Sequence, residues 1–242
     1  MLMNTQGIVI RSIKYGESSL ICDIYTRQWG MRSYIIHGVR QAKSKVSYLL
    51  LRPYALIDLI VYHNEEKKLN NIKEVKASYI YERLPFSVKH GAIALFMCEL
   101  LQKTLREMEA SEALFTFLQK SFQLLDQKEQ IASSFYLIFM AQLTYYLGFG
   151  PDVQSFQPNS NFDYKNGVFV QINHSPEQIA YFDTLSSQYL VDVYCTPLKE
   201  AETLLIPAPH RQKLYENLMD YFSFHIAGII ELQSYQILHT IF

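Results

Sequence analysis

The feature that most constrains the fold of this chain is a change of hydrophobic period near residue 80. Before it, short β-branched and aromatic stretches are separated by turn residues, which is typical of short strands. After it, apolar residues recur at intervals of three and four, as on one face of a helix. The clearest case is Ile93, Phe96, Met97, Leu100 and Leu101. The sequence therefore predicts an α+β chain with two domains, a strand-rich one at residues 1–80 and an α-helical one at residues 81–242.

Five strands are expected in the first domain, at residues 7–14, 20–26, 31–37, 48–62 and 69–77. The fourth is expected to be long or bent, and Pro53 inside it indicates an edge position or a bulge. The polar, basic segment before it is expected to be a loop. Five short strands joined by turns favour a small closed barrel, because closure removes exposed strand edges. An SH3-like barrel also fits this strand count.

Several helices are expected in the second domain. Ser111 favours the N-cap of the second helix, and residues 131–147 form a third that is apolar almost all round, so it should be central and buried. Gly148 is expected to end it in the left-handed conformation. An irregular insertion at about residues 152–174 has no periodicity, which indicates a long loop or a small β excursion. Later helices are expected to begin at Ser175 and Thr196 and to span residues 207–224 and 231–241.

The charge of the chain is distributed unevenly. The whole chain has 22 basic and 23 acidic residues, a net charge of -1, which taken alone argues against nucleic-acid binding. Residues 1–80, however, hold twelve bases and six acids, a net charge of +6, and residues 81–242 hold ten bases and seventeen acids, a net charge of −7. A basic barrel is suited to neutralising phosphates. A protein-interaction scaffold that binds an acidic partner through the same charges is the alternative.

Aromatic residues interleave with these bases, and their rings are suited to stacking on unpaired bases. The possible stacking residues are Tyr15, Trp29, Tyr34 and Tyr48. At strand spacing, however, aromatic residues are more often part of a core. Both interpretations stay open on the sequence alone.

Sequence motifs for catalysis and for metal binding are absent. HExxH, GxSxG, the phosphate-binding loop and GxGxxG do not occur, and none of the seven histidines has a second histidine three or four residues away. Cys22, Cys98 and Cys195 are few and widely spaced, which indicates free thiols in a reducing cytoplasm. We therefore expect no enzyme, with a hydrolytic site assembled from distant residues as the third hypothesis.

Membrane insertion and secretion are not expected. The longest apolar run, residues 135–141, has seven residues, whereas a membrane-spanning helix needs roughly 18–20. The first residues do not combine a basic segment with an apolar one, as a secretory signal does. The sequence thus predicts a cytoplasmic protein that does not use a membrane.

Three groups of residues, taken in order, resemble a known family. The first is residues 7–18 with Gly30 and Met31, and the second is His37 to Arg40 with Lys43, Ser44 and Lys45, which form a Gly-x-Arg-x-x-x-Ser basic loop. The third comprises residues 145–151 and, in the C-terminal part, residues 221–226 followed by residues 231–234. Together, over nearly the full length, they resemble the RecO family of bacterial recombination mediators and DNA repair proteins.

The resemblance implies a five-stranded OB-fold barrel followed by an α-helical domain. It implies binding of single- and double-stranded DNA, annealing of complementary strands, and assembly with RecR. It also implies docking of the C-terminal tail of single-strand-binding protein and loading of RecA onto the coated DNA, in a cytoplasmic, nucleoid-associated setting. Carried over residue by residue, the preferred DNA contacts are Arg40, Lys43 and Lys45, followed by Arg11, Lys14, Arg27 and Arg32.

One departure from the family concerns zinc. Many members carry four zinc-binding cysteines after the helix stop, but residues 152–171 contain none. Phe156, Phe162, Tyr164 and Phe169 stand there instead. We expect no zinc and no cofactor, and we expect these aromatic residues to form an apolar cluster that contributes a few kcal/mol.

Overall fold

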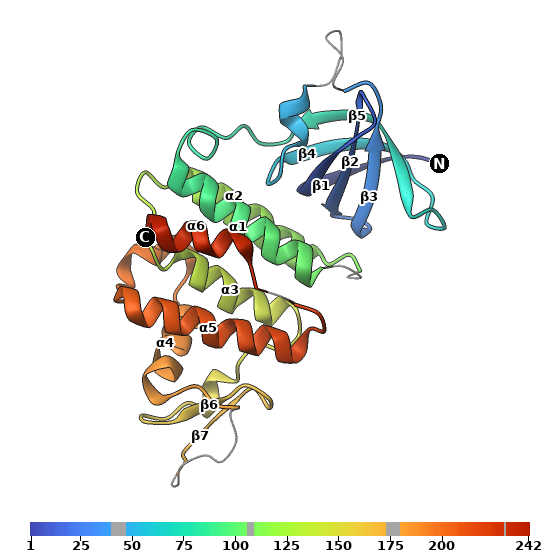
Figure 1. Cartoon of the computed structure of the whole chain (residues 1–242). Helices are drawn as coiled ribbons and strands as arrows, with labels where there is room; N and C mark the ends of the chain where they lie inside the picture. Colours follow the sequence, from blue (N-terminus) through green and yellow to red (C-terminus); the bar gives the residue numbers. More distant parts are fainter. Residues whose placement is uncertain (40–46, 106–108, 173–179, 230) are drawn as a thin grey trace. The chain divides into compact units, whose positions relative to one another are not determined.

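The computed structural model describes residues 1–39, 47–105, 109–172, 180–229 and 231–242. It forms two compact units, residues 1–127 and 128–242, whose elements are labelled in Figure 1. A closed five-stranded barrel is followed by a helical region, as the expected fold class requires. The domain boundary expected at residue 80 lies within the first unit and stays a prediction.

The barrel has the strand order β1-β2-β3-β5-β4, which is that of an OB fold. Its strands are β1 (Leu2–Tyr15), β2 (Ser19–Thr26), β3 (Gly30–Ile36), β4 (Leu56–Tyr62) and β5 (Leu69–Ala77). All pairs are antiparallel except β3 with β5, which is parallel. Strand β1 begins at Leu2, whereas the sequence predicted a start at residue 7.

Strand β1 closes the barrel because it pairs with β4 along its first half and with β2 along its second. Gly7 pairs with both neighbours, and a Cβ atom there would lie 2.6 Å from Ile24 Cγ2 and 3.0 Å from Leu59 Cδ1. The register then shifts between Val9 and Arg11. A glycine and a bulge thus let one strand bend sharply enough to serve two partners.

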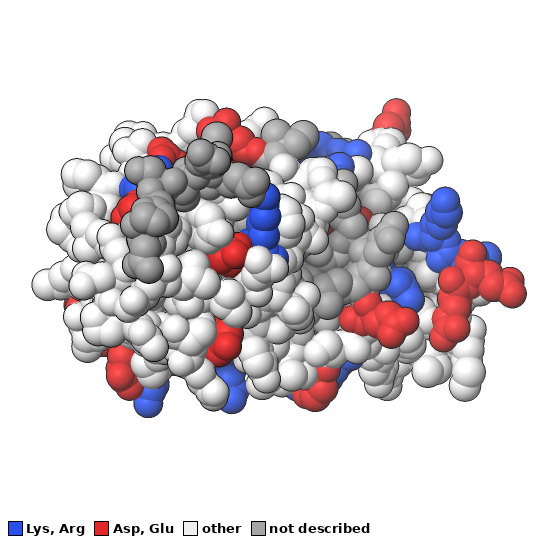
Figure 2. All heavy atoms as spheres, turned by 90° about the horizontal axis from the view of Figure 1, so that it is seen from below, with Lys and Arg blue, Asp and Glu red and all other residues white. Residues whose placement is uncertain are grey.

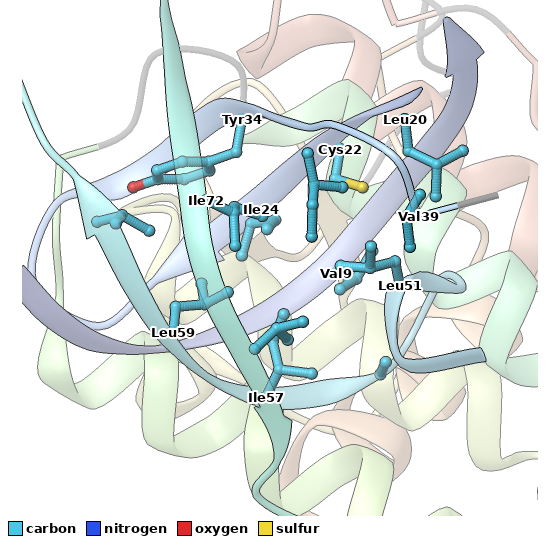
Figure 3. Close-up of a cluster of buried hydrophobic side chains, with 14 residues drawn as sticks. Val9, Leu20, Cys22, Ile24, Tyr34, Val39, Leu51, Ile57, Leu59 and Ile72 are labelled. Carbon is cyan, nitrogen blue, oxygen red and sulfur yellow. The ribbon is translucent and has the colours of Figure 1, made fainter. Parts of the chain in front are cut away.

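The interior of the barrel is an apolar cluster to which every strand contributes (Figure 3). Its members are Val9, Leu20, Cys22, Ile24, Tyr34, Ile36, Val39, Leu51, Ala55, Ile57, Leu59, Val61, Ile72 and Val75. Burial raises the pKa of the Cys22 thiol to about 11, so this cysteine behaves as a small apolar side chain.

The prediction of one long strand at residues 48–62 is wrong. A short 3₁₀ helix, η1 (Tyr48–Leu51), comes first, and β4 begins only at Leu56. Pro53 lies between the two elements, and Tyr54 follows with φ at 65°, an unfavourable conformation for a non-glycine residue. The amide of Tyr54 donates to the carbonyl of Val9 at 2.7 Å, which helps to hold this bend against β1.

Two helices, α1 (Val88–Thr104) and α2 (Glu112–Gln127), complete the first unit. The amide of Leu114 donates to the side chain of Ser111 at 3.2 Å, which confirms the expected N-cap. The ring of Tyr25 from β2 stacks on Phe115 of α2, with centroids 6.3 Å apart. Helix α2 therefore packs against the outside of the barrel.

The segment between barrel and helices is held by a buried carboxylate. Asp126, at the end of α2, is 1% exposed and accepts hydrogen bonds from the amides of Glu82, Arg83 and Leu84 at 2.8–3.0 Å. The Tyr79 hydroxyl also donates to it, at 3.3 Å. Burial by itself would raise the pKa of Asp126, but these hydrogen bonds to the charged form lower it.

The second unit is built around α3 (Phe135–Tyr146), in which nine of twelve residues are buried. The expected helix at residues 131–147 is thus confirmed but starts later, and Gly148 follows it with φ at 86°. Helix α3 contacts α4 (Thr184–Cys195), α5 (Ala208–His225) and the 3₁₀ helix η3 (Leu198–Thr203). The chain ends with α6 (Gln233–Ile241).

The expected insertion forms a small β excursion. After the 3₁₀ turn η2 (Val153–Ser155), strands β6 (Asn161–Asp163) and β7 (Val168–Val170) pair as a hairpin. The helix start expected at Ser175 lies outside the described residues. The helix described next, α4, begins at Thr184, where the carboxylate of Asp183 accepts from the amide of Ser186. In the described part of the chain, none of the helices is both long and apolar enough to cross a membrane.

Candidate nucleic-acid interface

The outer face of β1, β2 and β3 carries the residues from which a strand-binding site can be built. The register aligns Arg11 with Asp23, and Asp23 with Ser33, as one row across the three strands. The next row along is apolar and consists of Ile13, Ile21 and Ile35. Because alternate residues of a strand face opposite sides, these rows lie outside the barrel core.

Two hollows open along this face, and they share Met31 and Ser33. The first, of about 310 Å³, is lined by Arg11, Asp23, Met31, Ser33 and Gln102. The second, of about 460 Å³, is lined by Met31, Arg32, Ser33, Glu65, Glu66, Lys67 and Lys68. We call the two together the strand groove. Basic side chains lie at both of its ends, Arg11 at one and the lysines of the β4–β5 turn at the other.

Asp23 lines the first hollow of the groove. Its carboxylate accepts a hydrogen bond of 2.6 Å from the hydroxyl of Ser33. The guanidinium of Arg11 lies 3.7 Å away, and the two side chains are 44% and 25% exposed. Such a partly exposed pair is weakly stabilising, so Arg11 can exchange this contact for one with a phosphate at little cost.

Arg32 lies beneath the second hollow, partly buried. Its Nη1 atom donates to the carbonyl of Met31 at 3.0 Å, while its Nε atom is buried without a hydrogen-bond partner. Arg32, Lys67 and Lys68 outnumber Glu65 and Glu66 in this hollow, and the unused Nε donor of Arg32 suits an anion better than a neutral ligand.

The other sequence-predicted bases lie in different surroundings. Lys14 is exposed near the end of β1, next to Tyr15, which is 55% exposed. Arg27 is engaged inside the unit: it donates to Gln6, lies 3.0 Å from Glu112, and covers the ring of Phe115 at 4.8 Å. Arg27 therefore helps to join the barrel to α2, and the groove does not include it.

The residues predicted to stack on bases also differ in their exposure. Tyr15 is accessible, and Tyr48 is 46% exposed. Tyr34 is fully buried among the core side chains (Figure 3), and this burial raises the pKa of its hydroxyl to about 12. A buried ring cannot stack on a base, so we correct the prediction for Tyr34. Trp29 is partly buried and already stacks on His63.

Arg40, Lys43 and Lys45, the first choice from the sequence, lie outside the described residues. Their role stays a prediction. Conversely, sequence reasoning missed Asp23, Ser33 and Gln102 as parts of a site. A strand-pairing register would have brought Asp23 and Ser33 together, but Gln102 comes from α1, and only the tertiary structure places it there.

A larger hollow, of about 600 Å³, lies elsewhere on the first unit, against β1, β4 and β5. Its charged lining balances two acids, Asp58 and Glu74, against two bases, Arg27 and Lys76. Its lining therefore carries no net charge. The strand groove has four bases, Arg11, Arg32, Lys67 and Lys68, against three acids, Asp23, Glu65 and Glu66, and this net charge of +1 makes it the better candidate for a polyanion.

The charge asymmetry expected from the sequence persists between the two units. Residues 1–127 hold seventeen bases and twelve acids, and residues 128–242 hold five bases and eleven acids. On the face seen in Figure 2, however, blue and red side chains are interspersed on a largely uncharged surface. Net charge alone thus does not locate the site, whereas the groove does.

The described side chains around the β6–β7 hairpin do not offer the ligands of a zinc site. In the ranges that the structure describes, no group of three or more His, Cys, Asp or Glu side chains is placed to hold a metal. Phe162 instead packs against Phe169, Phe182 and Tyr221, with ring centroids 4.9–5.2 Å apart. The expected aromatic cluster is present, and the absence of zinc stays a prediction.

Comparisons with known proteins agree over the full chain. The family model described as recombination protein O N terminal matches residues 1–81, and the one described as recombination protein O C terminal matches residues 87–234. The DNA repair protein RecO of Flavobacterium johnsoniae is 30% identical over 245 residues, and that of Flavobacterium psychrophilum is 29% identical over 245. That of Phocaeicola vulgatus is 28% identical over 248, and each alignment covers 100% of both chains.

Proposed function

The chain belongs to the RecO family of DNA repair proteins, and we propose that it is a recombination mediator that binds single- and double-stranded DNA and anneals complementary strands. With RecR, it would help to load RecA onto DNA coated by single-strand-binding protein. It would act by binding rather than by catalysis, in the cytoplasm at the nucleoid.

The strand groove is the observation that carries this proposal. It runs along an open face of the barrel, with Arg11 at one end and Lys67 and Lys68 at the other. In OB folds, this side of the barrel and the adjoining turns commonly bind extended ligands such as oligonucleotides. Phosphates at the two ends would be neutralised by these cations, with release of bound counterions.

Annealing follows from the same electrostatics. Two complementary strands repel each other through their phosphates, and a basic surface that binds both lowers this repulsion without a cofactor. The basic stretch of sequence with Arg40, Lys43 and Lys45 would supply further contacts. The second unit, with its net negative charge, would leave the barrel as the DNA-binding part and would be available for protein partners.

Salt dependence of DNA binding tests the proposal. A fluorescently labelled oligonucleotide, single-stranded or in duplex, is titrated with the full chain at several salt concentrations, and anisotropy is measured. The logarithm of the affinity should fall linearly with the logarithm of the salt concentration. Replacing Arg40, Lys43 and Lys45 together by Ala should lower the slope for single strands by about 2, since each lost phosphate contact removes about 0.7.

An affinity that did not change with salt would contradict the proposal, as would normal binding by the triple variant. In that case the alternative of a scaffold for an acidic protein partner gains support. Annealing of complementary oligonucleotides, with and without single-strand-binding protein, tests the mediator role. Addition of RecR and RecA then tests loading, which should require the RecO-family protein when the strand is coated.

A further inference from the structure

We propose that Asp23 makes the strand groove selective for unpaired bases, so that the barrel prefers single strands to duplex DNA. This inference rests on the proposed function, because it requires that the barrel bind DNA. It assigns to an acidic residue a role that charge counting alone would not suggest. The carboxylate would accept hydrogen bonds from base edges and repel phosphates.

The carboxylate of Asp23 has free capacity to accept hydrogen bonds. A carboxylate can accept about four hydrogen bonds. The Ser33 hydroxyl donates one at 2.6 Å, and the Arg11 guanidinium, at 3.7 Å, is beyond ordinary hydrogen-bond distance. The side chain of Asp23 is 25% exposed and lines the hollow of about 310 Å³. Acceptor capacity therefore remains, directed to a space that a ligand can enter.

A duplex presents mainly phosphates to this hollow. The outside of a duplex is lined by phosphates, and its Watson–Crick edges are already paired. A phosphate placed beside Asp23 would meet a like charge, and at about 4 Å in water this costs about 1 kcal/mol. Duplex DNA would thus meet a repulsive group in the hollow of Arg11, in a groove whose other acids, Glu65 and Glu66, lie beside Lys67 and Lys68.

An unpaired strand, in contrast, can turn its bases toward the protein. Each of the four bases then exposes at least one N–H donor, an amino group or a ring N–H, on the edge that pairing would otherwise occupy. Asp23 can accept from any of them, and the carboxamide of Gln102 can donate or accept in the same hollow. The thioether of Met31 offers an apolar contact to the face of the base.

Apart from a phosphate bound by Arg11, the phosphates of that strand would then lie away from Asp23. Lys67 and Lys68, in the adjoining hollow, are exposed cations at a suitable place for them. The groove would recognise the unpaired state of the strand and not its sequence, because a carboxylate accepts from every base. This is the selectivity that a protein acting on single strands needs in the presence of excess duplex.

The test compares three probes on the full-length protein. They are a labelled single-stranded oligonucleotide, the same oligonucleotide with its central bases replaced by abasic sites, and the corresponding duplex. The variants are Asp23→Asn and, as a matched control, Asp58→Asn. Asp58 is another acid of the barrel, more exposed than Asp23 and with a hydrogen bond from Gln6 at 3.1 Å, but it lines the other hollow. Both variants remove one negative charge.

We expect the unmodified protein to bind the ordinary oligonucleotide more tightly than the abasic one. Asp23→Asn should tighten duplex and abasic binding by about fivefold, as expected from the loss of about 1 kcal/mol of repulsion, without tightening binding of the ordinary strand. The ratio of single-strand to duplex affinity should therefore fall about fivefold. Asp58→Asn should leave that ratio unchanged.

Equal ratios in the two variants would overturn the inference while leaving the proposed function intact. Equal binding of the ordinary and abasic oligonucleotides by the unmodified protein would overturn it as well, and that comparison does not depend on the folding of any variant. If the unmodified protein bound none of the three probes, the proposed function itself would fail. Melting temperatures of the two variants verify that both are folded.

Discussion

The indole ring of Trp29 lies nearly parallel to the imidazole of His63, with ring centroids 4.0 Å apart and an interplanar angle of 15°. His63 is 8% exposed, and both of its ring nitrogens are buried without a hydrogen-bond partner. Burial lowers the pKa of His63, and the positive charge of Arg32 lowers it further. Glu65 partly opposes this lowering, and the N-terminal amine adds a smaller lowering effect. The imidazole beneath Trp29 is therefore neutral in the folded barrel at neutral pH.

Acidification should quench the fluorescence of the protein through this pair. Trp29 is the sole tryptophan of the chain, and a protonated imidazole is a stronger quencher than a neutral one. Because the pKa of His63 is lowered, the midpoint should lie below 6.5, the ordinary value for histidine. The stability from the neutral imidazole is fully present above pH 6.5 and is lost as the pH falls toward the folded-state pKa.

Fluorescence and thermal melting measured between about pH 8 and pH 5 test this expectation. The matched variant is His63→Phe, which keeps an aromatic ring beside Trp29 but cannot be protonated. It should lose the fluorescence transition in this range. A transition that persisted in His63→Phe would show that another group titrates.

Asp126→Asn should strongly destabilise the first unit. The carboxylate accepts three backbone N–H groups and the Tyr79 hydroxyl, and an amide would place an N–H₂ group against some of these donors. Hydrogen bonds to a buried charge contribute about 1.5–3 kcal/mol each, so a loss of about 2–4 kcal/mol in the free energy of unfolding is expected. Urea unfolding monitored by circular dichroism measures it.

Glu112→Gln is the control on the same helix. Glu112 pairs with Arg27 at 3.0 Å but is 67% exposed, and such pairs contribute at most about 1 kcal/mol.

Since the pKa of Asp126 is lowered, the contribution of its carboxylate to stability is present above the ordinary carboxyl pKa and lost as the pH falls through the folded-state value. The difference between Asp126→Asn and the unmodified protein should hence shrink in acid, and a constant difference would argue against a charge effect.

Phe162→Ala should destabilise the second unit by about 3–5 kcal/mol, the usual cost of removing a buried phenylalanine ring. The ring is 0% exposed and contacts three other aromatic rings of the cluster. Phe224→Ala is the matched control, because Phe224 touches Tyr164 at 6.0 Å but is 51% exposed. Similar losses in both variants would show that the cluster does not stabilise the hairpin.

A metal assay gives an independent test of the same region. If the aromatic cluster stabilises this region without a metal, chelator treatment should leave the melting temperature unchanged and elemental analysis should find no zinc. Structural zinc contributes about 10–16 kcal/mol of binding free energy in small domains, so its removal would be obvious. One tightly bound zinc per chain would contradict the prediction.

The sequence predicted the barrel well because its strands alternate and are separated by turn residues. It failed at residues 48–62, where the apolar run continues through Tyr48–Leu51 without any change of composition. Pro53 indicated a break, but the positive φ of Tyr54 depends on hydrogen bonding to the distant Val9. Local propensity cannot represent such a tertiary contact.

The site was predicted less completely than the fold, for a related reason. Charge and aromatic content identified Arg11, Lys14, Arg32 and Tyr15 as surface candidates, but could not separate them from Arg27, which binds Gln6 and Glu112 within the unit. Whether an aromatic side chain faces the core depends on register, and Tyr34 has the inward one. Strand pairing decides the orientation of Tyr34, and packing of α2 on the barrel decides the role of Arg27; sequence alone gives neither.

Lys14 and Arg27 should therefore differ as DNA contacts although the sequence places both in the basic barrel. Lys14 is exposed, so Lys14→Ala should lower the salt slope for single-strand binding by about 0.7, one phosphate contact, with little effect on stability. Arg27→Ala should leave the slope unchanged and cost about 1–2 kcal/mol of stability, because it removes contacts with Gln6, Glu112 and Phe115. Lys120→Ala, on the exposed side of α2, should change neither quantity. Anisotropy at several salt concentrations and urea unfolding measure both effects, and a lower slope in Arg27→Ala would return Arg27 to the DNA interface.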